Sequence, residues 1–439
     1  MLNPELKKRL PQNLVKGKAF SYANPHKMPY AAVEDLLDLI VPERDVLEAG
    51  ERLSRLAPLI ERIFPETKAT NGLIESELRE LPKLKQALED KFSAKIPGRL
   101  FMKLDSHLPI AGSVKARGGI YEVLYFAETL ALQEGIISED EARERLADPD
   151  LRAFFSEYKI QVGSTGNLGM SIGLMAAALG FEAIIHMSAD AQGWKKELLR
   201  SRGVTVKEYE QDYSAAVAAG RAESAQDSKS YFVDDERSRQ LFLGYTVAGD
   251  RLKADLDQAK IQVDRRHPLF VYLPAGVGSA PGGIAYRLKQ LYKDAVHIFF
   301  METCPCPSLL LGMLTGAHEQ VRVQDADLSG QTLADGLACA SPSPFVSRLL
   351  RPLLSGFCTV EDKELTPLLK LLYENEQIFI EPSSCVALEG PARLLHEDSF
   401  RQYLIQEGVT EADLRHSNHI LWSTGGALVP DQIREDLLR

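Results

Sequence analysis

One stretch of the sequence is more informative than any other: Lys103-Leu-Asp-Ser-His-Leu-Pro-Ile-Ala-Gly-Ser-Val-Lys115-Ala-Arg-Gly-Gly119. It places Lys115 between a small-residue turn and a Gly-Gly pair, with Arg117 two residues further on. The apolar run 120–124 that follows predicts the start of a helix. Such a lysine is expected to be an amine on the floor of a site, where desolvation and a neighbouring cation favour its neutral, nucleophilic form.

The usual reaction of such an amine is formation of a Schiff base with a carbonyl compound, including the aldehyde of pyridoxal phosphate. A different interpretation fits this segment equally well. In that interpretation Lys115 is a solvated lysine at a helix start, and the two glycines only make turns. The rest of the chain has to decide between the two.

Around this segment, short apolar runs alternate with helical stretches, which predicts an α/β fold with parallel sheets covered by helices. The predicted strands are 100–104, 159–162, 183–187, 205–209, 269–273, 297–301, 378–380 and 419–423. Residues 1–95 have mainly helical patterning and carry no chemical motif. Because ligands collect at the carboxyl ends of parallel strands, the loops that begin there are the candidate sites.

The overall composition limits the class of protein. With 439 residues, of which 45% are hydrophobic, the chain is long enough for a large core and two domains. Its net charge of −11 gives no indication of nucleic acid or an anionic membrane as a partner. Five cysteines without a CxxC pair predict a reducing, cytoplasmic setting. The longest nearly apolar stretch, 170–181, is too short to cross a bilayer.

The first candidate loop, Gly163-Ser-Thr-Gly-Asn-Leu-Gly-Met-Ser171, follows the predicted strand 159–162. Backbone N–H groups at such a helix start can bind a carboxylate or a phosphate. The side chain of Asn167 offers both a donor and an acceptor, which suits a phenolic oxygen on a ring. A plain strand-to-helix turn capped by Ser and Thr is the competing interpretation.

The second candidate loop, Pro274-Ala-Gly-Val-Gly-Ser-Ala-Pro-Gly-Gly283, follows the predicted strand 269–273 and is a candidate phosphate cradle. It also matches a dinucleotide-binding Gly-x-Gly-x-x-Gly pattern, except that Pro281 stands at the third glycine. Glu302, at the end of the next predicted strand, lies where a nicotinamide enzyme has its ribose-binding acid. A nicotinamide-dependent dehydrogenase therefore stays open, as does a catalytically silent binding protein, which would not need Lys115.

The third candidate loop is Leu421-Trp-Ser-Thr-Gly-Gly-Ala427, whose hydroxyls suit a heteroaromatic nitrogen, although a simple turn explains it too. Two other clusters are predicted to lack catalytic function. Asp105, Ser106 and His107 are adjacent in sequence and therefore do not face one another as a catalytic triad does. The acidic segment 234–236 is predicted to be a charged loop rather than a catalytic pair.

A site lysine, an asparagine loop, a glycine loop and a late Ser/Thr-Gly-Gly, in this order, resemble the pyridoxal-phosphate enzymes of fold type II. These are the relatives of serine/threonine dehydratase and tryptophan synthase β. The longer segment 105–123 resembles the bacterial D-serine dehydratases. So do Ser164-Thr-Gly-Asn-Leu-Gly-Met-Ser171, Tyr231-Phe-Val-Asp-Asp-Glu236, Ala334-Asp-Gly-Leu-Ala338 and the extended N-terminal segment. The resemblance covers essentially the whole chain.

The resemblance implies roles for individual residues toward the cofactor. Lys115 corresponds to the Schiff-base lysine, Asn167 to the residue that bonds the 3′-oxygen, and Thr424 to the hydroxyl that faces the pyridine nitrogen. The phosphate loop corresponds to the second glycine loop, with Ser279 and Ala280 departing from the richer glycine pattern of the family. The phosphate-binding positions would be Gly276, Val277, Gly278, Ser279, Ala280 and Gly282.

The resemblance also implies a substrate site and a cation site. Backbone N–H groups of Ser164, Thr165, Gly166 and Asn167 would hold the substrate carboxylate. Thr165 would act as a hydroxyl acid or base on the face opposite Lys115. Glu302 would help to hold a monovalent cation, K⁺ or Na⁺.

A two-domain fold like that of tryptophan synthase β, with a helical N-terminal extension, follows from the same resemblance. Residues 1–95 are expected to form that extension and to pack on the large domain. The large cofactor domain would comprise 96–120 and 236–439, and would carry the lysine and the phosphate loop. The small α/β domain, 121–235, would carry the asparagine loop.

The implied reaction is α,β-elimination, which converts D-serine to pyruvate and ammonia and extends to D-threonine, giving 2-oxobutanoate. Since the residues by themselves do not fix substrate chirality, an L-serine/L-threonine dehydratase of the same fold is the main alternative. A monomer is favoured over a dimer, because the extra N-terminal segment would cover a surface that relatives use for dimerisation.

Overall fold

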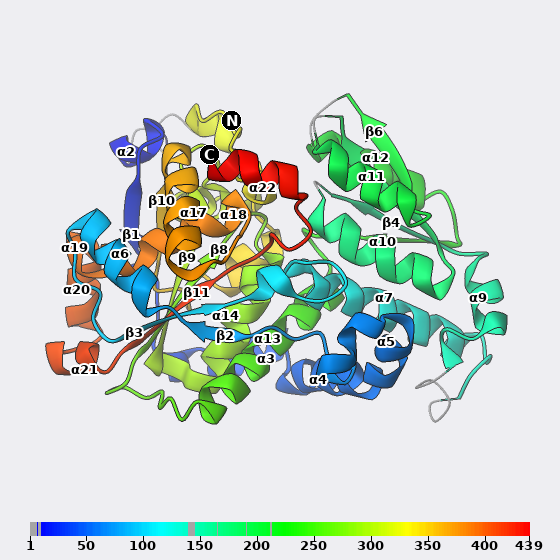
Figure 1. Ribbon diagram of the computed structural model, residues 1–439, viewed down its shortest axis with the longest axis horizontal. Helices are drawn as coiled ribbons and strands as arrows, with labels where there is room; N and C mark the ends of the chain where they lie inside the picture. Colours follow the sequence, from blue (N-terminus) through cyan, green and yellow to red (C-terminus); the bar gives the residue numbers. More distant parts are fainter. Residues whose placement is uncertain (1–6, 8–9, 139–144, 165, 190, 211–212) are drawn as a thin grey trace. The chain divides into compact units, whose positions relative to one another are not determined.

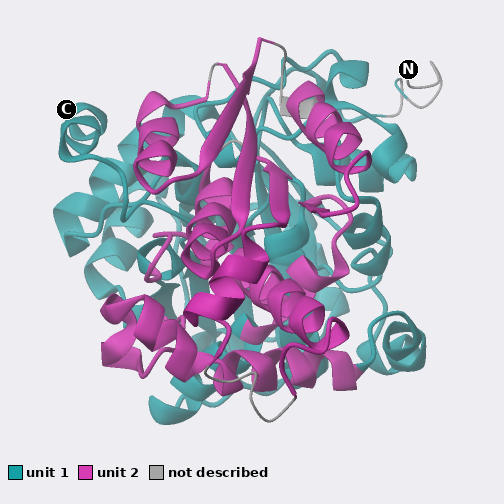
Figure 2. Cartoon of the chain, turned by 90° about the vertical axis from the view of Figure 1, so that its right-hand side faces the viewer, with its two compact units in different colours: residues 1–42, 76–107, 248–439 teal, residues 43–75, 108–247 magenta. Residues whose placement is uncertain are grey.

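The computed structural model describes residues 7, 10–138, 145–164, 166–189, 191–210 and 213–439. The chain divides into two compact units (Figure 2). Unit 1 comprises 1–42, 76–107 and 248–439, and unit 2 comprises 43–75 and 108–247. The three-part division predicted from the sequence stays a prediction.

Unit 1 is built on a seven-stranded sheet with the order β1-β10-β9-β8-β11-β3-β2 (Figure 1). The five central strands are parallel, and both edge strands pair antiparallel with their neighbours. All residues of β8 and β9 are buried, as expected for strands covered on both faces. The strands are β1 (Phe20–Ala23), β2 (Leu78–Glu80), β3 (Arg99–Lys103), β8 (Leu269–Pro274), β9 (Val296–Thr303), β10 (Gly356–Val360) and β11 (Asn418–Trp422).

Helices surround this sheet, and α13 (Arg239–Gln258) runs across the boundary between the two units. The other α-helices of unit 1 are α2 (Gln12–Val15), α3 (Glu34–Ile40), α6 (Pro82–Phe92), α14 (Ser279–Tyr292), α15 (Ser308–Thr315), α16 (Pro344–Leu349), α17 (Asp362–Glu376), α18 (Pro382–Cys385), α19 (Gly390–His396), α20 (Asp398–Gln406), α21 (Glu411–Arg415) and α22 (Asp431–Leu438). In the described part of the chain, no helix has the length and apolar character that a membrane crossing requires.

Unit 2 contains a four-stranded sheet, all parallel, with the order β6-β5-β4-β7. Its strands are β4 (Lys159–Gly163), β5 (Glu182–Ser188), β6 (Thr205–Tyr209) and β7 (Ser230–Val233). Its helices are α4 (Glu43–Arg55), α5 (Ala57–Ile63), α7 (Lys115–Gln133), α9 (Pro149–Phe155), α10 (Asn167–Leu179), α11 (Gly193–Ser201) and α12 (Tyr213–Ser224). Helices α10 and α12 pack on the sheet, and α7 packs on α10.

The predicted α/β architecture with parallel sheets is confirmed, with one wrong strand. The segment 378–380 is buried and extended but is not part of a sheet. This segment leads into Glu381, whose backbone N–H donates to the Gly425 carbonyl (2.8 Å). It is therefore a buried connecting segment and not a strand. Four strands were not predicted, β1, β2, β7 and β10. Three of them, β1, β2 and β7, are short edge strands, whose few residues carry little periodicity.

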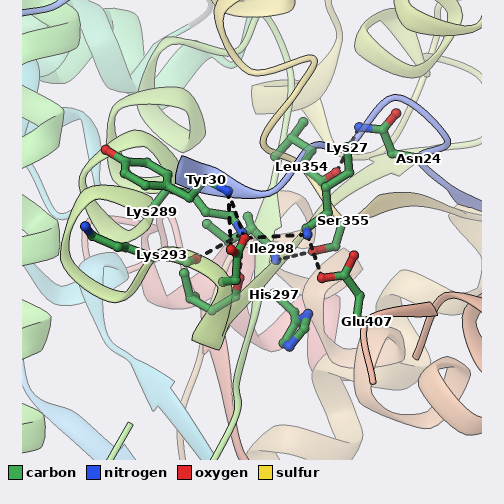
Figure 3. A network of polar contacts seen from close by, with 12 residues as sticks. Asn24, Lys27, Tyr30, Lys289, Lys293, His297, Ile298, Leu354, Ser355 and Glu407 are labelled. Carbon is green, nitrogen blue, oxygen red and sulfur yellow. Dashed lines mark hydrogen bonds and ion pairs between the residues drawn. The ribbon is translucent and has the colours of Figure 1, made fainter. Parts of the chain in front are cut away.

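A network of polar contacts ties residues 24–30 to the seven-stranded sheet of unit 1 (Figure 3). The Lys27 ammonium lies 2.6 Å from Glu407 and 3.8 Å from Asp294. Asp294 in turn accepts a hydrogen bond from the backbone N–H of Tyr30 (3.1 Å). This part of the N-terminal segment is therefore anchored by paired charges.

Lys289 lies fully buried beside this network, near the end of α14. Its ammonium donates to the carbonyl of Val296 (2.7 Å) and weakly to that of Lys293 (3.3 Å). Burial is the main cause that lowers the pKa of Lys289 to about 7, and the nearby Lys27 acts in the same direction. The lysine is therefore costly to bury in its charged form.

A Lys289→Met variant is expected to be more stable than the wild type at pH 7, and to lose this advantage as the pH rises toward 10.5. The unfolded chain keeps the lysine protonated up to its ordinary pKa of 10.5, whereas the folded chain releases the proton above about 7. Folding therefore becomes more favourable with rising pH across this window, by about 2 kcal/mol between pH 7 and pH 9. Urea unfolding at both pH values measures the difference. The exposed Lys253→Met is the control, and an equal pH dependence in both variants would contradict this account.

Candidate active site

The carboxyl edge of the sheet in unit 2 brings two loops together. Strands β4 and β7 are parallel neighbours, with Val162 opposite Val233. The asparagine loop follows β4, and the acidic turn 234–238 follows β7. Both loops therefore begin at the same edge of the sheet, where ligands bind in parallel α/β structures.

Lys115 is the first residue of α7, and its ammonium faces the carboxylate of Asp235 at 3.1 and 3.5 Å. It also lies 5.6 Å from the centre of the buried Tyr245 ring. The neighbour expected from the sequence was a cation, and this is corrected. Arg117 points instead to the carbonyl of Ile74 (3.3 Å) and the carboxylate of Glu75 (3.1 Å).

Asp235 is the residue that the sequence interpretation missed, since the segment 234–236 was predicted to be only a charged loop. The signal was present in the sequence, because Asp235 stands two residues after a short Tyr-Phe-Val run, Tyr231–Val233, which lies in β7. A strand there would have placed the acid at a carboxyl edge.

The Gly-Gly pair after Lys115 lies inside α7 and does not make turns. A Cβ atom on Gly118 would lie 2.5 Å from the Tyr245 ring, and one on Gly119 would lie 2.1 Å from the Ser171 hydroxyl. These glycines therefore let α7 approach α13 and α10 closely. Gly119 stands four residues after Lys115, and Ser171 stands four residues after Asn167. The candidate residues Lys115 and Asn167 therefore each lie about one helical turn from this contact.

The asparagine loop is held by its own serine. The Ser164 hydroxyl accepts hydrogen bonds from the N–H groups of Gly166 (3.0 Å) and Gly169 (2.8 Å). The Ser164 N–H donates to the carbonyl of His186 (3.0 Å). In this conformation the N–H groups of Ser164 and Gly166 donate hydrogen bonds within the protein, and their predicted role as carboxylate donors stays a prediction. Thr165 lies outside the described residues.

Asn167 begins α10 directly after Gly166 and is partly exposed. Gly166 has φ 151°, and a Cβ atom there would lie 2.3 Å from Cδ of the buried Lys195. The close packing of Lys195 on this glycine fixes the approach of the chain to the helix start. A helix N-terminus of this kind favours an anion or an acceptor oxygen.

The glycine loop of unit 1 connects β8 to α14, with Gly278 (φ 116°) as the residue before the helix. A Cβ atom on Gly276 would lie 3.1 Å from the carbonyl oxygen of Gly336, inside the Ala334-Asp-Gly-Leu-Ala338 segment. The backbone on both sides is pinned, since Ala275 N–H donates to Met301 (2.8 Å) and Ser343 N–H to Val277 (2.8 Å). The loop is thus a rigid small-residue cradle at the start of a 14-residue helix.

Thr424 follows β11, the strand beside β8, and its hydroxyl lies 2.9 Å from the hydroxyl of Ser384. The same Ser384 oxygen accepts the backbone N–H groups of Thr424 (2.8 Å) and Gly425 (3.2 Å). Ser384, on α18, was not predicted from the sequence. It orients the hydroxyl of Thr424 and gives this part of the site neutral hydrogen-bonding groups.

Glu302 lies at the end of β9, on the other side of β8, and is completely buried. Its two carboxylate oxygens accept the N–H groups of Leu309 and Leu310, both at 2.9 Å, at the start of α15. Burial raises the pKa of Glu302 to about 8, and these two N–H donors act in the opposite direction. Because Glu302 is completely buried, it does not offer the accessible carboxylate that a nicotinamide ribose would need.

Each unit by itself fits a part of pyridoxal phosphate. In unit 1, the glycine cradle at the start of α14 suits the phosphate, and the hydroxyl of Thr424 suits a heteroaromatic nitrogen. In unit 2, the amine of Lys115 suits the aldehyde, and Asn167 suits the phenolic oxygen. The buried hydroxyl of Ser113, two residues before Lys115, has no hydrogen-bond partner among the described residues, as expected beside a site built for a polar ligand. The described residues contain no cluster of His, Cys, Asp and Glu suited to a metal ion.

Comparison with known proteins agrees with this chemistry. Residues 74–403 match the family model described as "Pyridoxal-phosphate dependent enzyme". A protein of Fusobacterium nucleatum named "Probable D-serine dehydratase" is 50% identical over 427 residues, covering 97% of this chain and 96% of its own length. One of Pseudomonas aeruginosa with the same name is 52% identical over 419 residues, covering 95% and 93%.

Among solved structures, diaminopropionate ammonia lyase from Escherichia coli has a TM-score of 0.70 at 16% identity, covering 96% of this chain and 97% of its own. The same enzyme in complex with D-serine gives 0.66 over the same shares. At this identity the likeness concerns the fold alone. The predicted fold class and the resemblance on which it rests are confirmed, and the chain belongs to the family of pyridoxal-phosphate-dependent enzymes.

Proposed function

We propose that this protein is a D-serine ammonia-lyase, which converts D-serine to pyruvate and ammonia and accepts D-threonine as a second substrate. The observation that carries the proposal is the identity of about half of all residues, along nearly the whole chain, with proteins named probable D-serine dehydratase. The position of Lys115 at a helix start, beside the carboxylate of Asp235, agrees with it.

We assign different residues to different steps of the elimination. When bound, pyridoxal phosphate withdraws electrons from the substrate α-carbon and so makes the α-proton removable. Lys115 would hold the cofactor, and its amine, once released, would take the α-proton. Thr165 is proposed as the hydroxyl acid or base on the opposite face. Asn167 would bind the 3′-oxygen and donate a backbone N–H to the substrate carboxylate.

In unit 1, we assign the phosphate to Gly276, Val277, Gly278, Ser279, Ala280 and Gly282. Thr424, oriented by Ser384, would face the ring nitrogen with a neutral hydroxyl. A hydroxyl stabilises a protonated ring nitrogen far less than a carboxylate does. The chain's own residues would thus limit how strongly the ring withdraws electrons, which favours elimination over transamination.

An Asn167→Ala variant is expected to lower kcat/KM for D-serine by about 10-fold or more, because the side chain fixes the ring for reaction. Its melting temperature is expected to change little, since Asn167 is partly exposed. Pyruvate release and thermal unfolding are measured on the same preparation. A loss of melting temperature with unchanged kcat/KM would show that the loop is only structural.

Glu302 is the proposed contact for a monovalent cation, K⁺ or Na⁺. A buried carboxyl with a raised pKa is stabilised in its charged form by a cation, which would offset the cost of burial. We further propose a monomer working in the cytoplasm, in view of the anchored N-terminal segment and of the five cysteines, which form no disulfide.

Pyruvate release from D-serine and from L-serine, measured separately on purified protein with added cofactor, tests the function. Release from D-serine alone is the expected result. Release from L-serine alone would replace the substrate with its enantiomer. No release from either would overturn the proposed activity.

A further inference from the structure

Three consecutive acidic residues follow β7, and they have different partners. Asp234 lies 2.8 Å from Arg221, and Glu236 lies 3.3 Å from the same guanidinium. Asp235, between them, points the other way and lies 3.1 Å from the ammonium of Lys115. The side chains of Asp235 and Lys115 are 10% and 19% exposed, so their ion pair is largely shielded from water.

The turn that carries Asp235 is held rigidly. The Asp234 carbonyl accepts the N–H groups of Arg237 (3.0 Å) and Ser238 (2.7 Å), and its carboxylate accepts that of Glu236 (3.1 Å). These bonds close the turn before α13 begins. The direction of the Asp235 side chain is therefore set by its neighbours and does not depend on Lys115 alone.

A second link ties this turn to the helix of Lys115. Glu122, seven residues after Lys115 on α7, is fully buried and accepts hydrogen bonds from Ser238 (2.7 Å) and Tyr231 (2.8 Å). Ser238 belongs to the turn and Tyr231 to β7. Glu122 thus holds the turn against α7, so the folding of unit 2 sets the distance between Lys115 and Asp235.

We propose that Asp235 is the positioning residue of Lys115, holding the free amine in place and accepting its proton when the lysine attaches to the cofactor. The proposal deepens the proposed function and rests on the assignment of Lys115 as the attachment site. Asp235 acts through Lys115 and is not assigned a contact with the substrate.

Attachment is the condensation of the Lys115 amine with the aldehyde of the cofactor. The ammonium of Lys115 gives one proton to a carboxylate oxygen of Asp235, which frees the nitrogen lone pair. That lone pair forms a bond to the aldehyde carbon of the cofactor, and the aldehyde oxygen leaves as water with the two remaining amine hydrogens. A carboxylate already at 3.1 Å provides the acceptor at the start of the step.

The test is the rate at which the full-length apoprotein takes up pyridoxal phosphate. Borohydride trapping at successive times, followed by peptide mass analysis, counts the label at Lys115. Asp235→Asn is expected to slow labelling by about 10-fold or more, and Asp235→Glu to restore most of the rate, because the carboxylate returns. Glu236→Gln is the matched control, since the Glu236 side chain pairs with Arg221 while its turn bond uses the backbone N–H, which the substitution keeps, and it is expected to label at the wild-type rate. Melting temperatures of all variants are measured alongside.

Labelling of Asp235→Asn within twofold of the wild type would overturn the proposal. So would equal slowing in Glu236→Gln, because the effect would then come from the loss of any acidic side chain in the turn. If the wild type itself carries no label at Lys115, the assignment beneath the proposal fails as well. If the wild type is labelled at Lys115 and releases pyruvate, but Asp235→Asn is labelled as fast as the wild type, only the role of Asp235 is refuted.

Discussion

Replacing Lys115 with alanine is expected to lower turnover of D-serine by about 1000-fold or more and to abolish covalent attachment of pyridoxal phosphate. The variant removes the only group we propose for holding the cofactor covalently, together with the proposed acceptor of the α-proton. Since the amine pairs with Asp235 in a largely shielded position, its loss leaves that carboxylate without this partner and should cost about 1–3 kcal/mol of stability. Pyruvate release and borohydride-trapped label measure the two losses.

A matched control separates the chemistry from the ion pair. Lys159 stands at the other end of the same sheet, at the start of β4, and pairs with Asp227 at 2.9 Å. Lys159→Ala removes a lysine and breaks a salt bridge in unit 2 but is expected to keep wild-type turnover. If Lys115→Ala still releases pyruvate at a rate near that of Lys159→Ala, the assignment of Lys115 is wrong.

Gly278→Ala is expected to weaken binding of pyridoxal phosphate by about 10-fold or more and to lower turnover in proportion at limiting cofactor. Gly278 has φ 116°, which a residue with a Cβ atom adopts only at a cost of about 1–3 kcal/mol. Its Cβ atom would also lie 3.1 Å from Val346. Relief of this strain would move the backbone at the start of α14, where the phosphate is proposed to bind. Cofactor titration of the apoprotein measures the affinity.

Replacing any left-handed glycine with alanine strains the backbone and lowers stability. The control must therefore replace a left-handed glycine outside the glycine loop. Gly408 has φ 73° and open space around its Cα atom, in the same unit. Gly408→Ala is expected to lose stability through its left-handed backbone alone, with unchanged cofactor affinity. Equal affinity in both variants would mean that the glycine loop does not hold the phosphate.

The sequence predicted strands well where the apolar run is continuous. The runs 269–273 and 297–301 became β8 and β9, because continuous apolar residues of this length are typical of central parallel strands. The run 378–380 has the same composition but no neighbouring strand to pair with. Pairing is a property of the sheet, and local composition does not contain it.

The places of the candidate site residues along the helices and strands were predicted from the sequence, but their contacts with one another were not. Lys115, Asn167, Gly278 and Thr424 all lie at helix starts or strand ends, as their motifs indicated. Ser384 was missed because it reaches Thr424 across 40 positions of sequence, and nothing in its own surroundings marks it. Its role depends on α18 packing beside the end of β11.

By itself, the sequence determined the alternation of strands and helices along most of the chain, the candidate loops and the lysine that begins α7. These follow from local periodicity and from glycine, serine and threonine at turns, which act over a few residues. The tertiary structure decided which charges meet. It turned Asp235 toward Lys115 across 120 residues, sent Arg117 to Glu75, and engaged the Ser164 N–H with His186. Such contacts depend on how β4 and β7 pair and how α7 packs, because side chains distant in sequence come within bonding distance only when the whole unit has folded.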